Sequence, residues 1–458
     1  IIIFFAVENM SFLFLNFRYD CFPDKATYNH YYSLMNKKIF TALIVFMSGI
    51  AFMSSCSEDD SPRPVEPGSQ WSATVKGNGE VIGAYPDLYS NYWEYTYDIS
   101  RHGDKVLRFT GEFPHCRYFS FSVYDDENGS AIGGIDDAAI EPDNGSENPF
   151  RISTTKTGRF TVYLVPENLA EDFKKKFAPE NICIVKDGVR KACVMVRQYL
   201  GTDATGTNHD EYGGVELPLI TAINPTTGKE VELPEHIVSN VYSATSNVYI
   251  LKSDELREVP FFLAPVSKYY PNNSTAYLYA RTRLRSDSVL TFSFIPAPIP
   301  QKAENYSGAA ARYWSICLGS AADTRSYDSL CDRNANWTDG EKAEFVICLK
   351  NNPRLAEVKA KVESQQKAGK NVNIMIWDSE KLNIDGKPLS EYIAFMYRNI
   401  LPNPAWEYSI SNMIPTEYYD GVKEPIDHVT NPQKQIANIA LGDYGPSGIK
   451  LSTEEYLR

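Results

Sequence analysis

Short apolar segments separated by polar turns dominate the chain from residue 71 onward. Residues 106–110, 117–124 and 160–165 are rich in aromatic and β-branched side chains, with partial alternation of apolar and polar positions. This pattern predicts β-strands. The sequences at 125–129 and 142–145 combine Asp, Asn and Gly, which is typical of turns. Short strands with turns about eight to twelve residues apart favour antiparallel β-sandwiches.

Three segments carry the spacing of amphipathic helices instead. Residues 167–177 follow a proline, and residues 354–368 place apolar side chains on one face. Residues 389–401 carry an apolar stripe made of Ile393, Met396, Tyr397 and Ile400. Prolines at 402 and 404 are expected to end this last helix.

The same elements occur twice in the same order. The first copy carries Tyr-Pro at 85–86, an apolar strand at 106–110, Arg-Tyr-Phe-Ser at 117–120, Asp137, Phe-Thr-Val at 160–162 and Leu-Ala-Glu at 169–171. The second carries Tyr-Pro at 270–271, a strand at 289–293, Arg-Tyr-Trp-Ser at 312–315, Asp332, Phe-Val-Ile at 345–347 and Leu-Ala-Glu at 355–357. This period is far longer than that of a solenoid repeat. We therefore predict a mainly β protein of two tandem, internally duplicated antiparallel β-sandwich or jelly-roll-like domains, residues 71–232 and 233–458, with a few peripheral helices.

The segment before these domains has a different character. Residues 1–34 fit no targeting pattern, and we interpret them as an upstream extension that is not part of the mature protein. Residues 35–55 start with Met-Asn-Lys-Lys and continue with an apolar run at 39–53, which is short for a membrane-spanning helix of about 20 residues. Small residues and then Cys56 follow, and residues 56–70 predict an acidic, proline-rich tether.

The sequence Met-Ser-Ser-Cys at 53–56 resembles the lipobox of bacterial lipoproteins, with methionine in place of the usual leucine. The acidic residues 58–60 resemble the export signal of Bacteroidota surface lipoproteins. The resemblance implies lipidation of Cys56, attachment to the membrane through it, and a cell-surface location on the outer membrane. The alternative is an ordinary transmembrane anchor with a cytoplasmic tail.

Composition and net charge limit the classes of molecule that the protein is expected to bind. The formal net charge is −13, and the chain has no long block of lysine and arginine, so a nucleic-acid partner is not expected. The chain contains 30 tyrosines, which suit half-buried strands. The alternative is that some of them form surfaces on which sugars stack.

Cysteines, the other metal-binding residues and the common motifs give no sign of a metal or a cofactor. The cysteines of the predicted domains are Cys116, Cys183, Cys193, Cys317, Cys331 and Cys348, without a Cys-x-x-Cys pair. We expect buried free thiols, although a hairpin with a bulge around residues 186–189 would allow a Cys183–Cys193 disulfide. Residues 332–336 match the start of a calcium loop but Trp337 replaces its glycine, so a surface turn is the preferred interpretation.

Charged residues recur at matching positions. Arg117 and Arg312 start corresponding strands, and Asp137 and Asp332 each follow twenty residues later. We expect an Arg–carboxylate fork within each copy, as a buried structural ion pair. The alternative is a charged groove for an anionic or polyhydroxyl ligand.

Two histidines are candidate general bases. His115 adjoins Arg117, and His209 lies in a polar loop at 207–211. Together with Arg117 and Asp137 these histidines are the catalytic candidates, although a solvated loop histidine is the simpler interpretation. The chain contains no His-Glu-x-x-His, no Gly-x-Ser-x-Gly and no glycine-rich phosphate loop.

Several longer stretches resemble a family of uncharacterised secreted bacterial proteins with a duplicated Arg-Tyr-Phe/Trp-Ser motif. They lie at 113–120, 140–150, 197–199, 213–218, 312–315, 371–373, 377, 398–402 and 442–444. Cys116 departs from the alanine usual in this family, and the surroundings of Trp377 lack the usual Trp-Leu-Pro character. The resemblance implies the fold and the duplication, but no activity.

These observations lead to three hypotheses of function. The first is a surface lipoprotein that binds an extracellular polymer such as a glycan, with Tyr89, Tyr92 and Trp93 as an aromatic platform and Arg312 and Asp332 as polar contacts. The second is a hydrolase with its site between the two domains. The third is a structural envelope protein.

Overall fold

The computed structural model describes residues 70–75, 85–153, 158–243, 251–264, 270–321, 325–383, 386–416 and 428–458. Residues 63–458 form one compact unit. The predicted extension, the signal peptide, Cys56 and nearly all of the tether lie outside the described residues.

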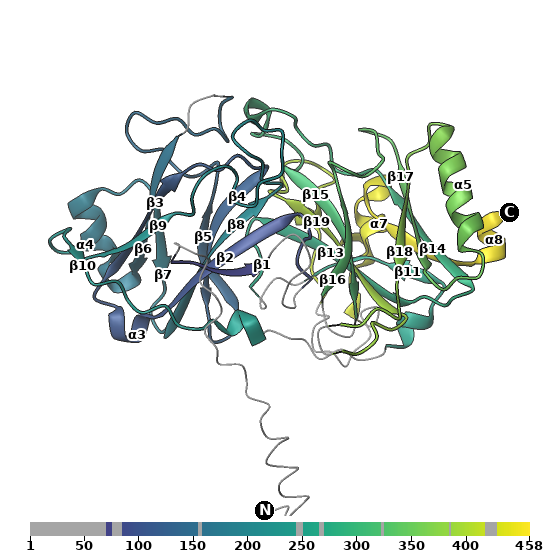
Figure 1. Ribbon diagram of the computed structural model, residues 1–458, viewed down its shortest axis with the longest axis horizontal. Helices are drawn as coiled ribbons and strands as arrows, with labels where there is room; N and C mark the ends of the chain where they lie inside the picture. The colour runs from purple at the N-terminus through teal and green to yellow at the C-terminus, as the bar shows by residue number, and fades with distance from the viewer. Residues whose placement is uncertain are drawn as a thin grey trace, which may run out of the picture. The chain divides into compact units, whose positions relative to one another are not determined.

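The first half of the described chain folds into two five-stranded sheets (Figure 1). One has the order β1 (Ser72–Val75), β2 (Ser90–Asp98), β8 (Lys191–Tyr199), β4 (Tyr118–Asp125) and β5 (Ser130–Asp136). The other has the order β10 (Glu230–Val231), β9 (Leu219–Ile223), β3 (Val106–Glu112), β6 (Arg159–Pro166) and β7 (Ile182–Val185).

The second half repeats this arrangement. Its first sheet has the order β12 (Phe262–Leu263), β13 (Thr275–Arg283), β19 (Tyr392–Ile400), β15 (Tyr313–Ser320) and β16 (Ser326–Cys331). Its second has the order β11 (Glu258–Pro260), β20 (Ser447–Ser452), β14 (Ser288–Phe294), β17 (Ala343–Leu349) and β18 (Val372–Trp377). Strands at equal positions in the two orders carry the sequence matches, so the predicted mainly β, duplicated fold is confirmed. We call β1–β10 the first copy and β11–β20 the second copy.

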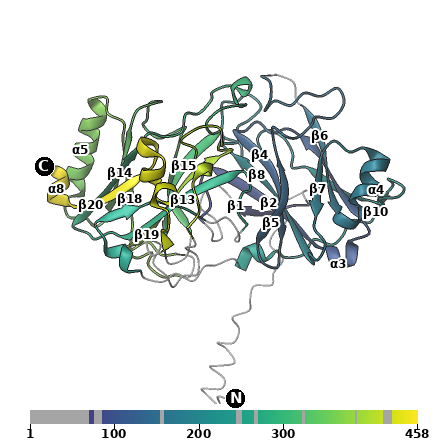
Figure 2. The same cartoon turned by 180° about the vertical axis from the view of Figure 1, so that it is seen from behind.

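In each copy a helix covers the second sheet, which we call the outer sheet. The helix α4 (Glu167–Phe177) joins β6 to β7, and α5 (Leu355–Lys367) joins β17 to β18, so each of these strand pairs is parallel. Both helices are confirmed predictions. In both views α5 lies beside α8 (Thr453–Leu457) against the second copy's outer sheet (Figures 1 and 2). The remaining helices are short: α3 (Ile99–His102), α6 (Pro432–Gln435), α7 (Ala437–Ala440), and the 3₁₀ turns η2 (Asn240–Ser243), η3 (Lys252–Glu255), η4 (Ala303–Asn305), η5 (Ile410–Asn412) and η7 (Gly442–Tyr444).

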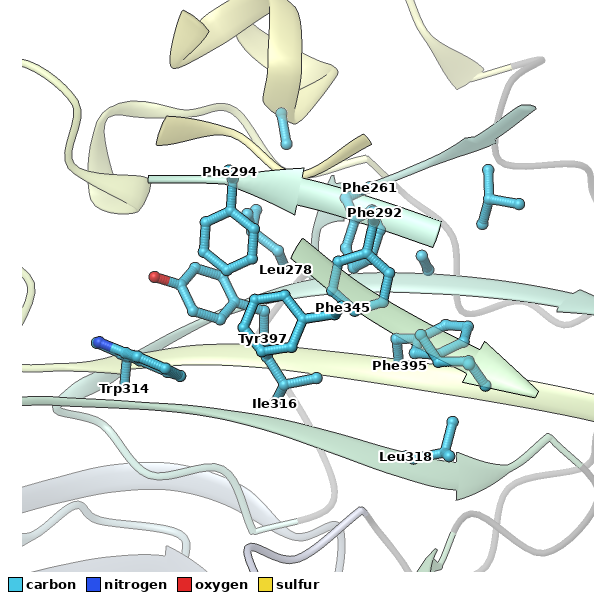
Figure 3. Close-up of a cluster of buried hydrophobic side chains, with 14 of the residues drawn as sticks. Phe261, Leu278, Phe292, Phe294, Trp314, Ile316, Leu318, Phe345, Phe395 and Tyr397 are labelled. Carbon is cyan, nitrogen blue, oxygen red and sulfur yellow. The ribbon is translucent and has the colours of Figure 1, made fainter. Parts of the chain in front are cut away.

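Each copy has its own aromatic core between its two sheets. In the second copy Phe292 stacks on Phe345 within one sheet, at 5.3 Å between ring centroids, and meets Phe395 of the facing sheet edge to face at 5.6 Å (Figure 3). Interlocking rings from two facing sheets are the packing expected of a β-sandwich.

The predicted helix at 389–401 is wrong, because residues 392–400 form β19, the central strand of its sheet. Ile393, Phe395 and Tyr397 face the sandwich core, whereas Ala394 and Met396 pack on the opposite side. A strand that is buried on both faces has no polar face, so its apolar residues also satisfy a helical spacing.

The alternative of a hairpin that would allow a Cys183–Cys193 disulfide is also wrong. Cys183 lies in β7 opposite Leu164, and Cys193 lies in β8 opposite Thr96, so the two cysteines belong to different sheets. The six cysteines of the described chain are free thiols. The expectation of buried free thiols holds for five of them, whereas Cys116 is half-buried.

Candidate functional site

Arg117 and Arg312 each pair with the aspartate of the opposite copy. Arg117 Nη1 lies 2.5 Å from Asp332 Oδ2, and Arg312 Nη1 lies 3.0 Å from Asp137 Oδ1. The prediction of a fork within each copy is therefore wrong. In each copy the backbone N–H of the aspartate donates to a carbonyl of its own copy, that of Phe119 for Asp137 and that of Trp314 for Asp332. The arginine side chain extends instead to the other copy.

These exchanged pairs are built as structural contacts. The side chains of Arg312 and Asp137 are 3% and 0% exposed, and Asp137 also accepts the backbone N–H of Phe119. Burial raises the pKa of Asp137 to about 6 despite the charge of Arg312, and burial likewise raises the pKa of Asp332. Removing one member of such a pair costs about 3–5 kcal/mol, because the other charge stays buried.

A second exchange joins the Tyr-Pro loops to the opposite copy. Arg398 Nη2 donates to the carbonyl of Tyr85 at 2.8 Å, and Arg197 Nη2 donates to the carbonyl of Tyr270 at 2.6 Å. Tyr85 and Tyr270 both have left-handed backbones, with φ of 49° and 54°. The conformation is uncommon for a bulky residue, and the same arginine contact holds it in both copies.

The residue after each Tyr-Pro pair differs between the copies. Asp87 Oδ2 accepts hydrogen bonds from the hydroxyls of Tyr313 at 2.9 Å and Ser315 at 2.5 Å. At the corresponding place Asn272 Oδ1 accepts from the hydroxyl of Tyr118 at 3.1 Å. We call eight charged or amide residues of these contacts the inter-copy joint: Asp87, Arg117, Asp137, Arg197, Asn272, Arg312, Asp332 and Arg398. Sequence reasoning gave no role to Asp87, Arg197, Asn272 or Arg398, although Arg197 and Arg398 lie in the stretches that carry the family resemblance, and Asp87 and Asn272 directly follow the repeated Tyr-Pro pairs.

The predicted aromatic platform is largely buried and takes part in folding contacts. Tyr92 is 5% exposed and lies under Arg197, whose guanidinium carbon is 4.1 Å from the ring centroid. Trp93 is 1% exposed and stacks on Tyr212 in the first core. Tyr89 is half-buried, and its hydroxyl donates to the carbonyl of Ser329 in the second copy. These rings are therefore not arranged as a surface on which a sugar could stack.

The backbone of His115 contacts the loop that carries His209, but the two histidines do not form a catalytic arrangement. His115 binds the loop at 201–214 through its backbone, since its carbonyl accepts from the N–H of Thr202. His209 is exposed, and its Nδ1 lies 3.1 Å from the carbonyl of Gly201. The neighbouring candidates Arg117 and Asp137 are engaged in the inter-copy joint. The hydrolase hypothesis therefore loses the carboxylate and the arginine on which it depended.

Metal chemistry has no support in the described part of the chain. Within these ranges no three side chains of His, Cys, Asp or Glu are placed to hold a metal ion. Asp332, the first residue of the predicted turn at 332–336, is bonded to Arg117 instead. Burial raises the pKa of Cys183 to about 12, so this thiol is not activated as a nucleophile.

Three aromatic side chains gather at the surface of the second copy. Trp406 lies in the loop after β19 and Tyr444 in η7, and both are half-buried against the second core. Tyr408 stacks on Tyr444 at 4.5 Å and 17° between the ring planes, and Trp406 meets Tyr444 edge to face at 5.1 Å. We call Trp406, Tyr408 and Tyr444 the surface aromatic cluster. Sequence reasoning missed it because Tyr444 lies far along the chain from Trp406 and Tyr408, and the three residues form no recognisable motif.

Polar groups surround this cluster. Glu407 is exposed, and its charge raises the pKa of Tyr408. Asp443 is exposed beside Tyr444 and pairs with Lys342 at 2.7 Å. Asn412 Nδ2 donates to the carbonyl of Trp406 at 3.0 Å, which holds the loop in place. The arrangement combines ring faces with carboxylates and amides, as in sites that bind polar ligands with apolar faces.

The corresponding loop of the first copy is different. After β8 it runs Thr-Asp-Ala-Thr-Gly-Thr-Asn-His-Asp from 202 to 210. Asp203 Oδ1 accepts from the backbone N–H groups of Thr205 and Thr207, which folds this loop on itself. The duplicated fold thus carries the aromatic cluster in its second copy, at a position where the first copy has a polar loop.

Comparisons with known proteins give little further information. No family model matches the chain, and no curated protein matches it. A structure of an uncharacterised protein from Burkholderia cenocepacia is similar at a TM-score of 0.41 and 11% identity, over 84% of this chain and 88% of that chain. A protein from Vibrio parahaemolyticus is similar at a TM-score of 0.38 and 9% identity, over 80% and 93%. Likenesses this distant carry no argument about function. Along the described residues, no helix has the length and apolar character to span a membrane.

Proposed function

We propose that the protein is a lipid-anchored cell-surface protein that binds an extracellular glycan through the surface aromatic cluster. The observation that carries this proposal is the half-exposed group of Trp406, Tyr408 and Tyr444, supported by the second core on one side and lined by polar groups on the other. Sugars have apolar C–H faces and polar edges. A stacked ring with carboxylates and amides around it suits both.

The charge around the cluster favours a neutral glycan. Glu407 and Asp443 are exposed beside the rings, and the chain as a whole carries a formal charge of −13. Like charges would repel a sulfated or uronic-acid polymer at this surface. Neutral hydroxyl groups can instead donate hydrogen bonds to the two carboxylates.

The anchor is supported by the sequence around Cys56. A chain held by fatty acids on this cysteine and spaced by residues 56–70 would present the folded unit outside the membrane, because stable attachment takes more than one acyl chain. A binding protein that stays on the cell can retain a polymer at its surface.

A glycan array with the full-length chain in mild detergent tests the binding function. We expect binding to a neutral glycan that falls by about tenfold or more in Tyr408→Ala, a loss of about 1.4 kcal/mol. Tyr408→Phe keeps the stacked ring and should retain most of the affinity. Phe177→Ala removes an exposed aromatic side chain from α4 of the first copy and serves as the control. Unchanged binding by Tyr408→Ala would refute the role of the cluster.

The same assay on intact cells tests the anchor. Wild-type cells should capture the glycan and incorporate a palmitate analogue into the protein, whereas Cys56→Ala should lose both. If the wild-type protein takes up no label, the proposed anchor is wrong, although the purified chain can still bind glycan.

A further inference from the structure

The two halves of the inter-copy joint have the same design but different charge. Arg197 in β8 and Arg398 in β19 occupy equal positions, each opposite a serine of the neighbouring strand, Ser120 or Ser315. Both arginines are buried, at 3% and 2% exposed. Each reaches the Tyr-Pro loop of the opposite copy. The residue that follows that loop's proline is Asp87 for Arg398 and Asn272 for Arg197.

Around Arg398 the charge is balanced. Arg398 Nη1 lies 3.5 Å from Asp87 Oδ2, which also accepts from Ser315 Oγ. One buried carboxylate therefore balances a buried cation and also accepts from two hydroxyls, those of Tyr313 and Ser315. Such an arrangement offsets much of the cost of burying the arginine.

Around Arg197 the charge is not balanced. Its Nη2 donates to two neutral oxygens, the hydroxyl of Tyr124 and the carbonyl of Tyr270, both at 2.6 Å. In the described part of the chain no carboxylate lies within ion-pairing distance of Arg197; Asn272 stands where Asp87 stands in the other half. A buried cation without a counter-charge is costly.

The polar groups beside Arg197 share one property. Ser120 Oγ and Asn272 Nδ2 are buried without a hydrogen-bond partner among the described residues, as is Arg197 Nε. Arg398 Nε, in the other half, is also buried without a hydrogen-bond partner among the described residues. The difference between the halves therefore lies in Ser120 and Asn272. An amide nitrogen, a hydroxyl and a guanidinium can all donate a hydrogen bond. They need an acceptor that carries negative charge and little volume.

We propose that Arg197, Ser120 and Asn272 bind one small monovalent anion, chloride, at the inter-copy joint. The anion supplies the charge that the Asp87 carboxylate supplies in the other half. A water molecule would satisfy the donors less well, because it must also place its own two hydrogens next to a buried cation. The expected consequence is a protein whose two copies are held together more firmly when chloride is present.

The test is thermal unfolding of the full-length chain in detergent, at constant ionic strength, in sodium chloride, sodium bromide or sodium gluconate. Gluconate is too large for a buried site between strands. We expect Tm to be higher in chloride and bromide than in gluconate by about 2 °C or more. Asn272→Asp supplies the missing carboxylate, so this variant should unfold at a higher temperature in gluconate and lose the dependence on halide.

Two further variants separate the proposal from general salt effects. Asp87→Asn removes the carboxylate from the other half without touching Arg197, so its Tm should fall while the halide dependence stays or increases. Ser120→Ala removes one donor with little change of volume and should weaken the dependence even if Asn272→Asp does not fold. Crystals soaked in bromide should show anomalous density next to Arg197.

The proposal is overturned if the wild-type Tm is equal in chloride and gluconate, or if Asn272→Asp and Ser120→Ala both keep the full halide dependence. The proposal is also overturned if anomalous bromide density appears only at exposed lysines and not next to Arg197. These results do not depend on glycan binding, since the joint and the surface aromatic cluster have no residue in common.

Discussion

At the scale of single residues, burial decides which side chains take part in folding contacts. Arg117, Asp137, Arg312 and Asp332 have the residue types of a catalytic or ligand-binding site, yet each charge is paired within the fold. The same holds for Tyr92 and Trp93, whose rings are buried. The surface aromatic cluster differs because Tyr408 stacks outside Tyr444 and is half-exposed.

Asp137 predicts a pH-dependent contribution to stability. Burial raises its pKa from 3.8 to about 6, so between these values the folded protein holds a proton that the unfolded chain has lost. The contribution of this group therefore falls as the pH rises from about 4 to about 6, and it is constant above that range. Urea denaturation of wild type and Asp137→Asn across this range measures the effect. The free energy of unfolding of the variant should fall less between pH 4 and pH 6 than that of wild type. Equal changes of this free energy with pH in the two proteins would contradict the prediction.

At the scale of elements, β3, β4 and β6 confirm the strands predicted at 106–110, 117–124 and 160–165, except that Arg117 lies just before β4. The mistaken helix at 389–401 shows the limit of periodicity. The strand β19 pairs with β13 on one side and β15 on the other, and both of its faces are covered. The register and burial of β19 depend on strands that are distant in the sequence. A local pattern of apolar residues therefore cannot predict them.

The central position of β19 predicts a large effect of truncating its core side chains. Phe395 is fully buried and meets Phe292 edge to face at 5.6 Å. Phe395→Ala should lower the free energy of unfolding by about 3–5 kcal/mol, because it leaves a cavity between the sheets. Glu363→Ala on the exposed face of α5 is the control, with an expected change within about 0.5 kcal/mol. The free energies of unfolding are measured by urea denaturation. Equal changes in the two variants would contradict the central, buried position of β19.

At the scale of the whole described unit, the two copies exchange side chains in both directions. Arg117 and Arg197 of the first copy contact Asp332 and Tyr270 of the second, and Arg312 and Arg398 contact Asp137 and Tyr85 in return. Each copy has its own core, but each also leaves a buried charge unpaired when the other is removed. We therefore expect the copies to unfold together.

Differential scanning calorimetry tests this coupling. Wild type should show one transition whose calorimetric and van't Hoff enthalpies agree, as for a cooperative unit. The double variant Arg117→Ala, Arg312→Ala removes one exchanged pair in each direction and should unfold at a lower temperature, with the transition broadened or split. Two separate transitions in wild type would show instead that the copies are independent.

The sequence by itself determined the features that depend on local composition and on repetition. Apolar alternation and turn residues predicted the strands β3, β4, β6 and β14, the faces of α4 and α5 predicted those helices, and the recurring Arg-Tyr and Tyr-Pro pairs predicted the duplication. The tertiary structure alone decided which arginine meets which aspartate, since those partners are 175 and 215 residues apart. It also decided that Trp406 and Tyr444 meet at one surface. Local physics sets the shape of a segment, whereas the pairing of distant side chains is set by how the folded sheets face one another.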